Sequence, residues 1–338
     1  MQFSCKNEIP LGDGALENAL GVKQCMGEVS TCVNTDDRIG TIRACSSFRT
    51  LFFCYTMDMD VEALLLDLIR RTACELPQDI LEAMQCARGV ECEAPAQMAF
   101  DTILENCRLA RCRHTPMCQD TGTLTFFWKV PAGTAQQPLV EAAARAVRTA
   151  TQCGWLRKNT IETLSGTSVD DNVALGIPVH HFEEVDCEVP EVTLLLKGGG
   201  SENMSCQYSL PEGRLGAGRD LAGVRACVLD AVHRIQGQGC APGILGVCIG
   251  ADRAEGYAVA KQQLLRPLPD VSPVPELANL EERLLQEANT LGIGPMGLGG
   301  KTTLLGVKIA SRTRLPASYF VTIAYCCWAC RRQTVTLK

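Results

Sequence analysis

The chain has 338 residues, a formal net charge of −6 and 46% hydrophobic residues. This length supports one large domain or two ordinary ones, and the composition is that of a globular protein rather than a disordered or fibrous one. Because the chain is acidic and offers no basic stripe to a phosphate backbone, we expect no nucleic-acid partner.

The first residues lack the basic segment and long apolar run of a secretory signal. The longest apolar run near them spans residues 51–55, which is far below the roughly 20 residues that a membrane helix needs. We therefore expect a cytoplasmic protein that does not enter a membrane.

Cysteine is unusually frequent, with 20 residues in the chain. Secreted disulfide frameworks are usually much shorter chains, so we expect most of these thiols to be reduced. Free cysteine behaves as a small hydrophobic residue and is often buried, which accounts for the majority. Only about three to five of them should take part in chemistry, the usual number in a cluster or redox site.

Residues 1–58 are interpreted as an N-terminal extension of uncertain structure, followed by one domain over residues 59–338. The extension has no His and no C-x2-C pair, so its spacing does not favour a zinc site. Its cysteines are Cys5, Cys25, Cys32, Cys45 and Cys54.

The domain opens with a helical layer, according to the spacing of its apolar residues. The first helix is predicted to begin at Asp60, which can cap it, and to end before Pro77. Further helices are predicted over residues 78–87 and 94–110. β-Branched and aromatic residues then predict a strand over 123–131, followed by a helix over 138–152.

The second half of the chain alternates between apolar runs and amphipathic segments. Two runs, 173–179 and 189–196, predict adjacent strands joined by a hairpin-like connection. Helices are predicted over 218–235, 253–265 and 275–291. Strands are predicted over 244–249 and 320–325, and a further strand is predicted to end at residue 309. These elements predict an α+β fold, a mixed sheet covered by helices.

Chemical groups are most concentrated at residues 117–122, which read Met-Cys-Gln-Asp-Thr-Gly. A thiol, an amide, a carboxylate and a hydroxyl share one turn that ends in Gly at the start of a predicted strand. Cys118 in such a turn can be a metal or cluster ligand, a nucleophile or an inert core thiol.

Three consecutive glycines follow another predicted strand, after Lys197. Glycines there let the backbone expose several N–H donors at one point, which suits a carboxylate or phosphate. The alternative is a flexible turn.

A second Gly-rich segment ends in Gly300, Lys301 and Thr302, which invites comparison with a phosphate-binding P-loop. That motif needs Gly five residues before Gly300, where this chain has Pro295. The segment also leaves a helix and enters a strand, the reverse of a P-loop. We therefore do not predict nucleotide binding.

Three cysteines, Cys118, Cys240 and Cys327, lie at the ends of predicted strands or helices. Their wide separation excludes a compact ferredoxin-type run but permits a cluster held by three distant ligands, with one iron free to act as a Lewis acid. Cys327 and Cys330 also form a C-x-x-C pair, close to the last residue and without a second pair.

These motifs resemble the iron–sulfur-dependent class I fumarate hydratases and tartrate dehydratases, specifically their α subunit or N-terminal domain. The resemblance covers about residues 59–332. It rests on the segments at 117–122, at 197–203 (Lys-Gly-Gly-Gly-Ser-Glu-Asn), at 239–243 (Gly-Cys-Ala-Pro-Gly) and at 292–300, and on the Cys-Trp-Ala-x-Arg-Arg ending that selects Cys327 over the neighbouring Cys326.

The resemblance implies a [4Fe–4S] cluster held by Cys118, Cys240 and Cys327 where their loops converge at the sheet rim. The open iron would bind a 2-hydroxydicarboxylate, and the reaction would be the reversible hydration or dehydration of a fumarate/malate or tartrate type of substrate. The residues implied to face this substrate are Gln119, Asp120 for proton transfer, Arg157 for a carboxylate, and the backbone of Gly198, Gly199 and Gly200.

The resemblance also implies partners. In the family further substrate-binding residues come from a β subunit or C-terminal swivelling domain, so we expect such a partner on another chain, and a homodimer of the α unit. A family His about a dozen residues before the third cysteine is Leu315 here. An alternative of another class is a non-catalytic or redox-sensing iron–sulfur or thiol protein that uses Cys327 and Cys330.

Overall fold

A computed structural model of the chain describes residues 47–337, with side chains from Val61 onward. Its helices are α1 (Ser47–Cys74), α2 (Gln78–Val90), α3 (Ala94–Arg113), α4 (Gln136–Gln152), α5 (Gly199–Asn203), α6 (Leu221–Ile235), α7 (Arg253–Gln263) and α8 (Pro275–Asn289). Its strands are β1 (Thr123–Val130), β2 (Val179–Glu184), β3 (Glu191–Lys197), β4 (Cys206–Ser209), β5 (Gly243–Ile249), β6 (Leu304–Ser311), β7 (Phe320–Cys326) and β8 (Arg331–Thr336).

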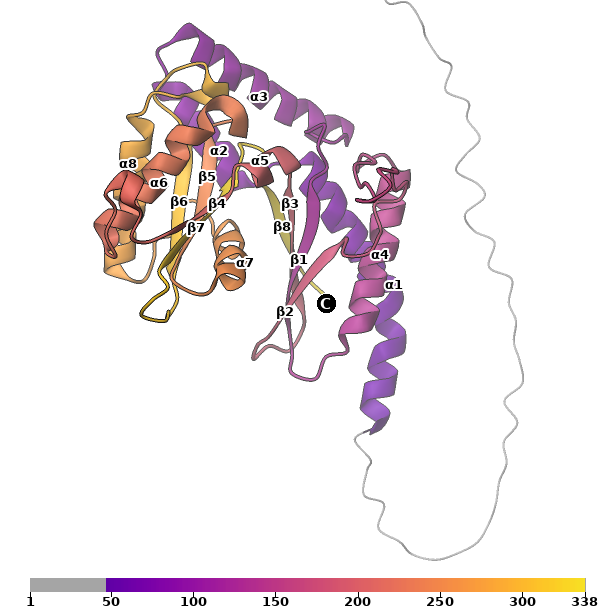
Figure 1. Cartoon of the computed structure of the whole chain (residues 1–338). Coiled ribbons are helices and arrows are strands. Elements are labelled where there is room, and N and C mark those ends of the chain that lie inside the picture. Colours follow the sequence, from indigo (N-terminus) through magenta and orange to yellow (C-terminus); the bar gives the residue numbers. More distant parts are fainter. Residues whose placement is uncertain (1–46, 338) are drawn as a thin grey trace, which may run out of the picture. The chain divides into compact units, whose positions relative to one another are not determined.

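The strands form two four-stranded sheets, ordered β2-β1-β3-β8 and β4-β7-β5-β6 (Figure 1). Each sheet is mixed, because β1 pairs with β2 and β5 pairs with β6 in parallel while the other pairs are antiparallel. The predicted α+β class is confirmed, with two sheets in place of one.

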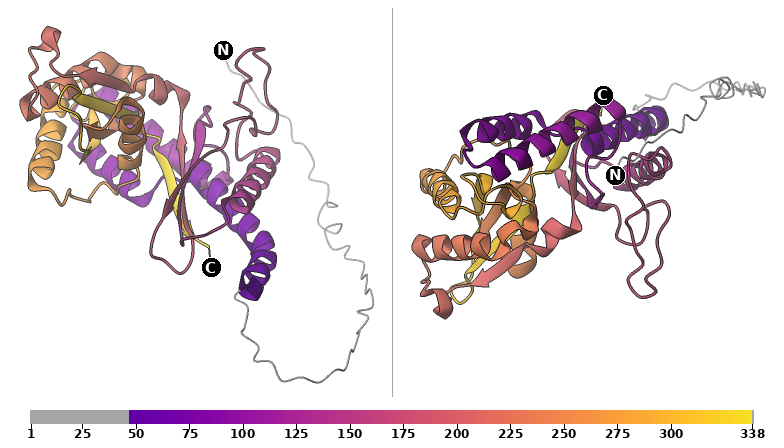
Figure 2. Two further views of the ribbon diagram at one scale, coloured as in Figure 1. Left: turned by 60° about the horizontal axis from the view of Figure 1, so that its bottom comes forward. Right: turned by 90° about the horizontal axis from the view of Figure 1, so that it is seen from above.

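Helices α1 and α4 cover one face of the β2-β1-β3-β8 sheet (Figure 2). Alternate side chains of β1 point to that face, since successive residues of a strand face opposite sides. Phe126 and Trp128 are buried there against Leu65 and Leu68 of α1 and Ala146 of α4.

The β4-β7-β5-β6 sheet is covered on both faces. Helices α6 and α8 pack on one face, and α7 packs on the other together with residues of α2 and α3. Every residue of β5 is buried, as expected of a strand covered on both sides. A side chain at Gly246 would collide with the carbonyl oxygen of Ala260, so glycine lets α7 lie directly on the strand.

The chain crosses between the two sheets twice. It leaves β3 after Lys197 and reaches β4 through α5, and it leaves β7 after Cys326 and starts β8 at Arg331. Because Arg331 is paired with Leu196 of β3, both crossings lie side by side. The Gly-rich segment and the Cys327 segment are therefore neighbours.

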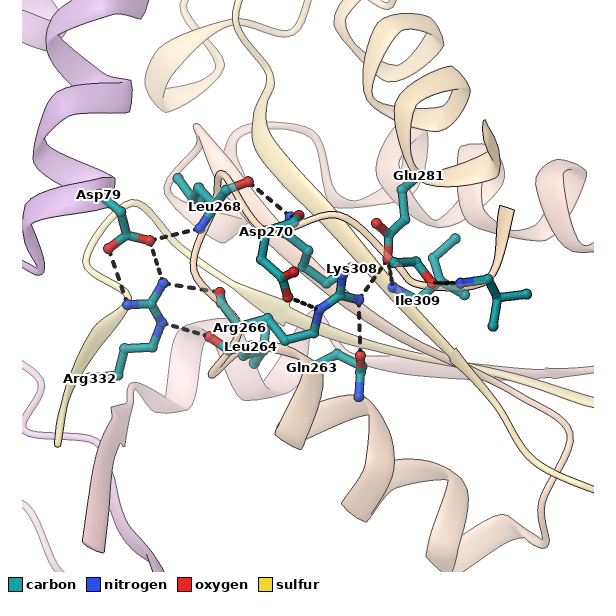
Figure 3. Close-up of polar contacts among 12 residues, drawn as sticks. Asp79, Gln263, Leu264, Arg266, Leu268, Asp270, Glu281, Lys308, Ile309 and Arg332 are labelled. Carbon is teal, nitrogen blue, oxygen red and sulfur yellow. Dashed lines mark hydrogen bonds and ion pairs between the residues drawn. The ribbon is translucent and has the colours of Figure 1, made fainter. Parts of the chain in front are cut away.

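A buried polar network ties α2 to the second crossing (Figure 3). Arg332 of β8 binds Asp79 of α2 through two nitrogens, at 2.6 and 3.2 Å. The same guanidinium donates to the carbonyl oxygens of Leu264 and Arg266, at 2.9 and 3.1 Å. Farther along, Arg266 binds Glu281 of α8 at 2.8 Å.

Several predicted elements need correction. Helix α1 begins at Ser47, so Asp60 lies inside the helix and does not cap it. The other residues of the predicted extension, 1–46, lie outside the described part of the chain. The prediction that they hold no zinc site is therefore not tested. The predicted strand over 173–179 is a loop that meets β2 only at its last residue.

The predicted hairpin between the two apolar runs is also wrong. Strand β1 lies between β2 and β3, so these two strands are not paired. Strand β2 contains the His-rich stretch because its imidazoles stack on the aromatic rings of β1, His180 on Phe126 at 5.3 Å and His181 on Phe127 at 5.0 Å. Burial lowers the pKa of His180 to about 4, so this side chain is neutral at pH 7.

Strands β4 and β8 were not predicted. Both strands are short, and β8 begins with two arginines, so its sequence lacks the alternation of apolar and polar residues that indicates a strand. Within residues 47–337, no helix is both long enough and apolar enough to span a membrane.

Candidate active site

The turn at residues 117–122 lies against the end of β3. Gly122 has φ +78°, and a Cβ on it would come within 2.6 Å of the carbonyl carbon and oxygen of Lys197. Only glycine fits this close approach in a left-handed conformation. The turn is thereby fixed against the first glycine of the Gly-rich segment.

Asp120 is held in place through both of its carboxylate oxygens. Gly122 N–H donates to Oδ1 at 2.9 Å, and Gly199 N–H, in the first turn of α5, donates to Oδ2 at 2.6 Å. A Cβ on Gly198 would lie 2.9 Å from Oδ2. One of the glycines predicted to bind an anion thus donates its N–H to a carboxylate of the chain itself. Gly200 remains exposed.

Arg157 is anchored to the same turn by its backbone. Its N–H donates to Thr121 Oγ1 at 2.8 Å, and its carbonyl oxygen accepts the Thr121 hydroxyl at 2.9 Å. The Arg157 side chain is exposed, as is that of Gln119. The structure therefore brings Gln119, Asp120 and Arg157 to one place.

Asn172 organises the loop that carries Arg157. This side chain is fully buried, and its amide nitrogen donates to the Arg157 carbonyl oxygen at 2.9 Å. Its oxygen accepts the N–H groups of Asn159 and Thr160, both at 3.2 Å. With φ 58°, Asn172 adopts the left-handed conformation that Asn tolerates better than most residues.

Arg331 lies beneath the turn. Its side chain is 2% exposed, and Nη2 donates to the Asp120 carbonyl oxygen at 2.9 Å. Lys197, also 2% exposed, binds Glu202 of α5 and donates to Ser205 Oγ at 3.2 Å. Two buried cations therefore lie at the crossings between the sheets.

The three predicted cluster cysteines come from three segments that meet here. Cys118 and Cys327 both pack at the edge of the core that α2, α3 and α7 form against the second sheet. The Cys240 carbonyl oxygen accepts the N–H of Trp328 at 3.2 Å, which joins the Cys240 turn to the Cys327 segment. Burial raises the pKa of Cys240, and the charges of Cys327 and Cys118 raise it further.

Cys240 therefore lies within range of the charges of both Cys118 and Cys327. No three His, Cys, Asp or Glu side chains between Val61 and Leu337 are close enough to hold one metal ion. In a cubane cluster each thiolate binds a different iron, so the ligands stand farther apart than those of a single ion. Bound iron would also reverse the pKa rise, since a coordinated thiol is deprotonated.

The backbone of the Cys240 turn is packed against the second Gly-rich segment. A Cβ on Gly237 would lie 2.8 Å from the Met296 carbonyl oxygen and 2.9 Å from Gly297 Cα, and Met296 N–H donates to the Ala241 carbonyl oxygen at 2.8 Å. The segments at 239–243 and 292–300 are therefore one structural unit.

The other features singled out in the sequence have structural roles. Glu91, 3% exposed, accepts the N–H groups of Lys301 and Thr302 at 2.9 and 2.7 Å, so a carboxylate of the chain occupies the turn that resembled a P-loop. Leu315 is 74% exposed in the loop that precedes β7, whereas Cys327 follows the other end of that strand.

Cys330 and Cys326 are buried in the core, and the cysteines from Cys74 to Cys330 are all free thiols. A buried thiol is poorly suited to exchange with a redox partner. The C-x-x-C alternative is therefore not favoured.

Sequence reasoning missed the residues that position the site: Thr121, Asn172 and Arg331. Asn172 carried a signal, because it follows two aspartates in a stretch rich in turn-forming residues. The roles of Thr121 and Arg331 depend on contacts with residues far away in the chain, which no local pattern contains.

A sequence model of the family described as fumarate hydratase (fumerase) matches residues 62–336. The chain therefore belongs to the class I fumarate hydratase family. This family also includes proteins named as α subunits of L(+)-tartrate dehydratase.

Among its relatives is a putative class I fumarate hydratase of Geobacillus stearothermophilus, 48% identical over 78% of this chain and 52% of that protein. Another is a putative L(+)-tartrate dehydratase subunit alpha of Methanocaldococcus jannaschii, 32% identical over 83% of this chain and 98% of that protein. The L(+)-tartrate dehydratase subunit alpha of Escherichia coli K12 is 29% identical over 77% of this chain and 85% of that protein. The chain thus spans about half the length of the Geobacillus relative.

Proposed function

We propose that this chain is the cluster-binding unit of a hydro-lyase that reversibly hydrates or dehydrates a dicarboxylate of the fumarate/malate or tartrate type. The observation that carries the proposal is that hydrogen bonds join the segments of the three thiols to one another and to the Asp120 carboxylate and the Arg157 loop. Membership of the fumarate hydratase family supports the same reaction class.

The residues proposed to hold a [4Fe–4S] cluster are Cys118, Cys240 and Cys327. Such a cluster supplies a Lewis-acidic iron that makes hydroxide a better leaving group. The Asp120 N–H lies 3.5 Å from Cys118 Sγ, so the turn that would present the thiolate also offers it a backbone donor.

Asp120 is the proposed base that removes the proton from the carbon next to a substrate carboxylate. Gly122 and Gly199 each donate to one carboxylate oxygen, so the group is fixed in orientation before substrate binds. A positioned base contributes roughly 10²- to 10⁴-fold to such a proton transfer. In the reverse direction the protonated carboxyl returns the proton to carbon.

Arg157 is proposed to bind a substrate carboxylate, with Gln119 beside it and the backbone of Gly198–Gly200 as a source of further donors. Because the Gly199 N–H is bound to Asp120, the donors left for substrate are those of Gly198 and Gly200. A guanidinium can bind a carboxylate through two parallel hydrogen bonds. Because Thr121 ties the Arg157 backbone to the Asp120 turn, carboxylate binding and proton transfer would keep a constant spacing.

The active form is proposed to include a β subunit or C-terminal swivelling domain on another chain, a homodimer of the α unit, and a cytoplasmic location. In support, the chain spans about half of the Geobacillus relative, and two other relatives are named as α subunits.

Iron and sulfide analysis of anaerobically reconstituted cysteine variants tests the proposal. We expect Cys118→Ser, Cys240→Ser and Cys327→Ser each to lose most of the cluster, because each removes one of three ligands. Cys326→Ser controls for the neighbouring thiol and Cys248→Ser for a buried core thiol, and both should retain it. Retention of the cluster by any of the first three variants would contradict the ligand set.

A further inference from the structure

Two buried hydrogen-bond donors without partners lie on either side of Cys327. Four buried side-chain nitrogen or oxygen atoms between Val61 and Leu337 have no hydrogen-bond partner, and two of them are Tyr325 Oη and Arg331 Nε. Native proteins pair nearly all buried polar groups, so two unpaired donors that flank Cys327 in the sequence call for an explanation.

The Tyr325 hydroxyl lies under the Cys240 turn. The residue is 1% exposed, and its ring fills the space that a side chain at Gly239 or Gly243 would need, with Cε1 2.5 Å from the Cβ position of Gly239. A tyrosine hydroxyl is protonated at neutral pH, so the buried Oη–H is a hydrogen-bond donor that has no acceptor among the described residues.

Arg331, the first residue of β8, lies next to the turn that carries Cys118 and Asp120. One nitrogen, Nη2, donates to the Asp120 carbonyl oxygen at 2.9 Å, while Nε is buried and unpaired. Asp120 is two residues after Cys118 in the same turn, so the Nη2 bond places the guanidinium beside the turn that carries one of the proposed ligands. The guanidinium forms no ion pair with a carboxylate in the described part of the chain, so its charge calls for an anionic neighbour.

We propose that Tyr325 Oη–H and Arg331 Nε–H donate hydrogen bonds to sulfur atoms of the cluster that Cys118, Cys240 and Cys327 bind. The inference rests on the proposed function, since it presupposes that cluster. Tyr325 and Arg331 are then positioning residues that tune the cluster without touching the substrate. Hydrogen bonds to sulfur stabilise the more negative, reduced state, so both donors raise the reduction potential of the cluster.

Tyr325→Phe, which removes only the hydroxyl, tests the first donor in the full chain. We expect wild-type iron and sulfide content after anaerobic reconstitution, and a more negative midpoint potential in a dye-mediated titration followed by electron paramagnetic resonance. In the cluster-free protein the thermal midpoint should be equal or higher, because an unpaired buried hydroxyl has been removed.

Tyr208→Phe is the matched control. Tyr208 is buried in the same core as Tyr325, but its hydroxyl donates to Asp230 Oδ2 at 2.7 Å. We expect this variant to lower the thermal midpoint of the cluster-free protein and to leave the potential unchanged. Arg331→Lys keeps the charge but removes the Nε donor, and it should shift the potential in the same direction as Tyr325→Phe.

The inference would be overturned if neither Tyr325→Phe nor Arg331→Lys moved the potential, or if Tyr208→Phe moved it equally. These results are distinct from a failure of the proposed function, in which wild-type protein would assemble no cluster at all.

Discussion

At the scale of single residues, the candidate site is built from backbone groups as much as from side chains. Asp120 is bound by two N–H groups, and Arg157 is bound through its own backbone to Thr121. Such contacts need glycine where the chains approach closely, as at Gly122, whose Cβ would collide with Lys197. The glycines of the family motifs therefore serve the geometry, while Cys118 and Asp120 are the residues proposed to carry the chemistry.

Asp120→Asn tests the proposed base. An asparagine can accept one of the two N–H bonds but cannot take up the proton, so we expect turnover to fall by roughly 10²- to 10⁴-fold. Iron and sulfide content should stay at the wild-type level, because no thiol is changed. Turnover is measured with the β-type partner supplied.

Asp170→Asn is the control for Asp120→Asn. Asp170 is an exposed carboxylate in the loop that follows Arg157, and among the described residues it pairs with Lys158, at 3.2 Å. This variant should leave turnover unchanged. Wild-type turnover in Asp120→Asn would rule out Asp120 as the base.

At the scale of elements, the ion pair between Asp79 of α2 and Arg332 of β8 holds the second sheet crossing (Figure 3). Arg331, the next residue of β8, reaches the Asp120 carbonyl oxygen. The position of the turn that carries Asp120, the proposed base, thus depends on how β8 is fixed to α2.

Asp79→Asn should destabilise the fold by roughly 2–4 kcal/mol, because it leaves the Arg332 guanidinium buried without its counter-charge. Asp67 is an exposed carboxylate on α1 that pairs with Arg70 and Arg71 of the same helix. Asp67→Asn removes these surface ion pairs and should cost about 0–1 kcal/mol. Urea unfolding at neutral pH measures both free energies, and equal losses would contradict the structural role of Asp79.

The loss of unfolding free energy caused by Asp79→Asn should depend on pH. Burial raises the pKa of this carboxyl, but the hydrogen bonds from Arg332 and Leu268 and the Arg332 charge outweigh it, so the pKa is lowered in the folded state. The ion pair therefore contributes its full stabilisation at pH values above the pKa of an unfolded-state Asp, about 4. This stabilisation is lost as the pH falls through the lower pKa of Asp79 in the folded protein. The difference between wild type and Asp79→Asn should shrink in that acid range.

At the scale of the whole molecule, the two sheets are joined at the two crossings where the candidate residues meet, and one hydrophobic core includes residues of both sheets, such as Leu195 of β3 and Ile244 of β5. The Gln119 and Arg157 side chains are exposed there. Residues of a second unit can reach these exposed side chains, in agreement with the proposed β-type partner.

The chain reconstituted alone should bind a cluster but hydrate fumarate negligibly, and turnover should appear when a β-type chain is produced with it. The physical reason is that elimination of water needs both substrate carboxylates held while the proton and the hydroxide depart. The measurement is the rate of fumarate consumption by each preparation at equal iron content. Full turnover by the chain alone would show that no partner is needed.

The sequence by itself determined the α+β class, most helices and central strands, and the motif residues that resemble one enzyme family. Those inferences succeed because helical and strand periodicity and glycine-rich turns are local properties of the chain. Only the tertiary structure decided that β1 separates β2 from β3, that the Arg331 guanidinium supports the Asp120 turn, and that Glu91 fills the loop at Lys301. Each of these is a contact between residues distant in sequence, and its stability depends on burial and pairing that no single segment contains.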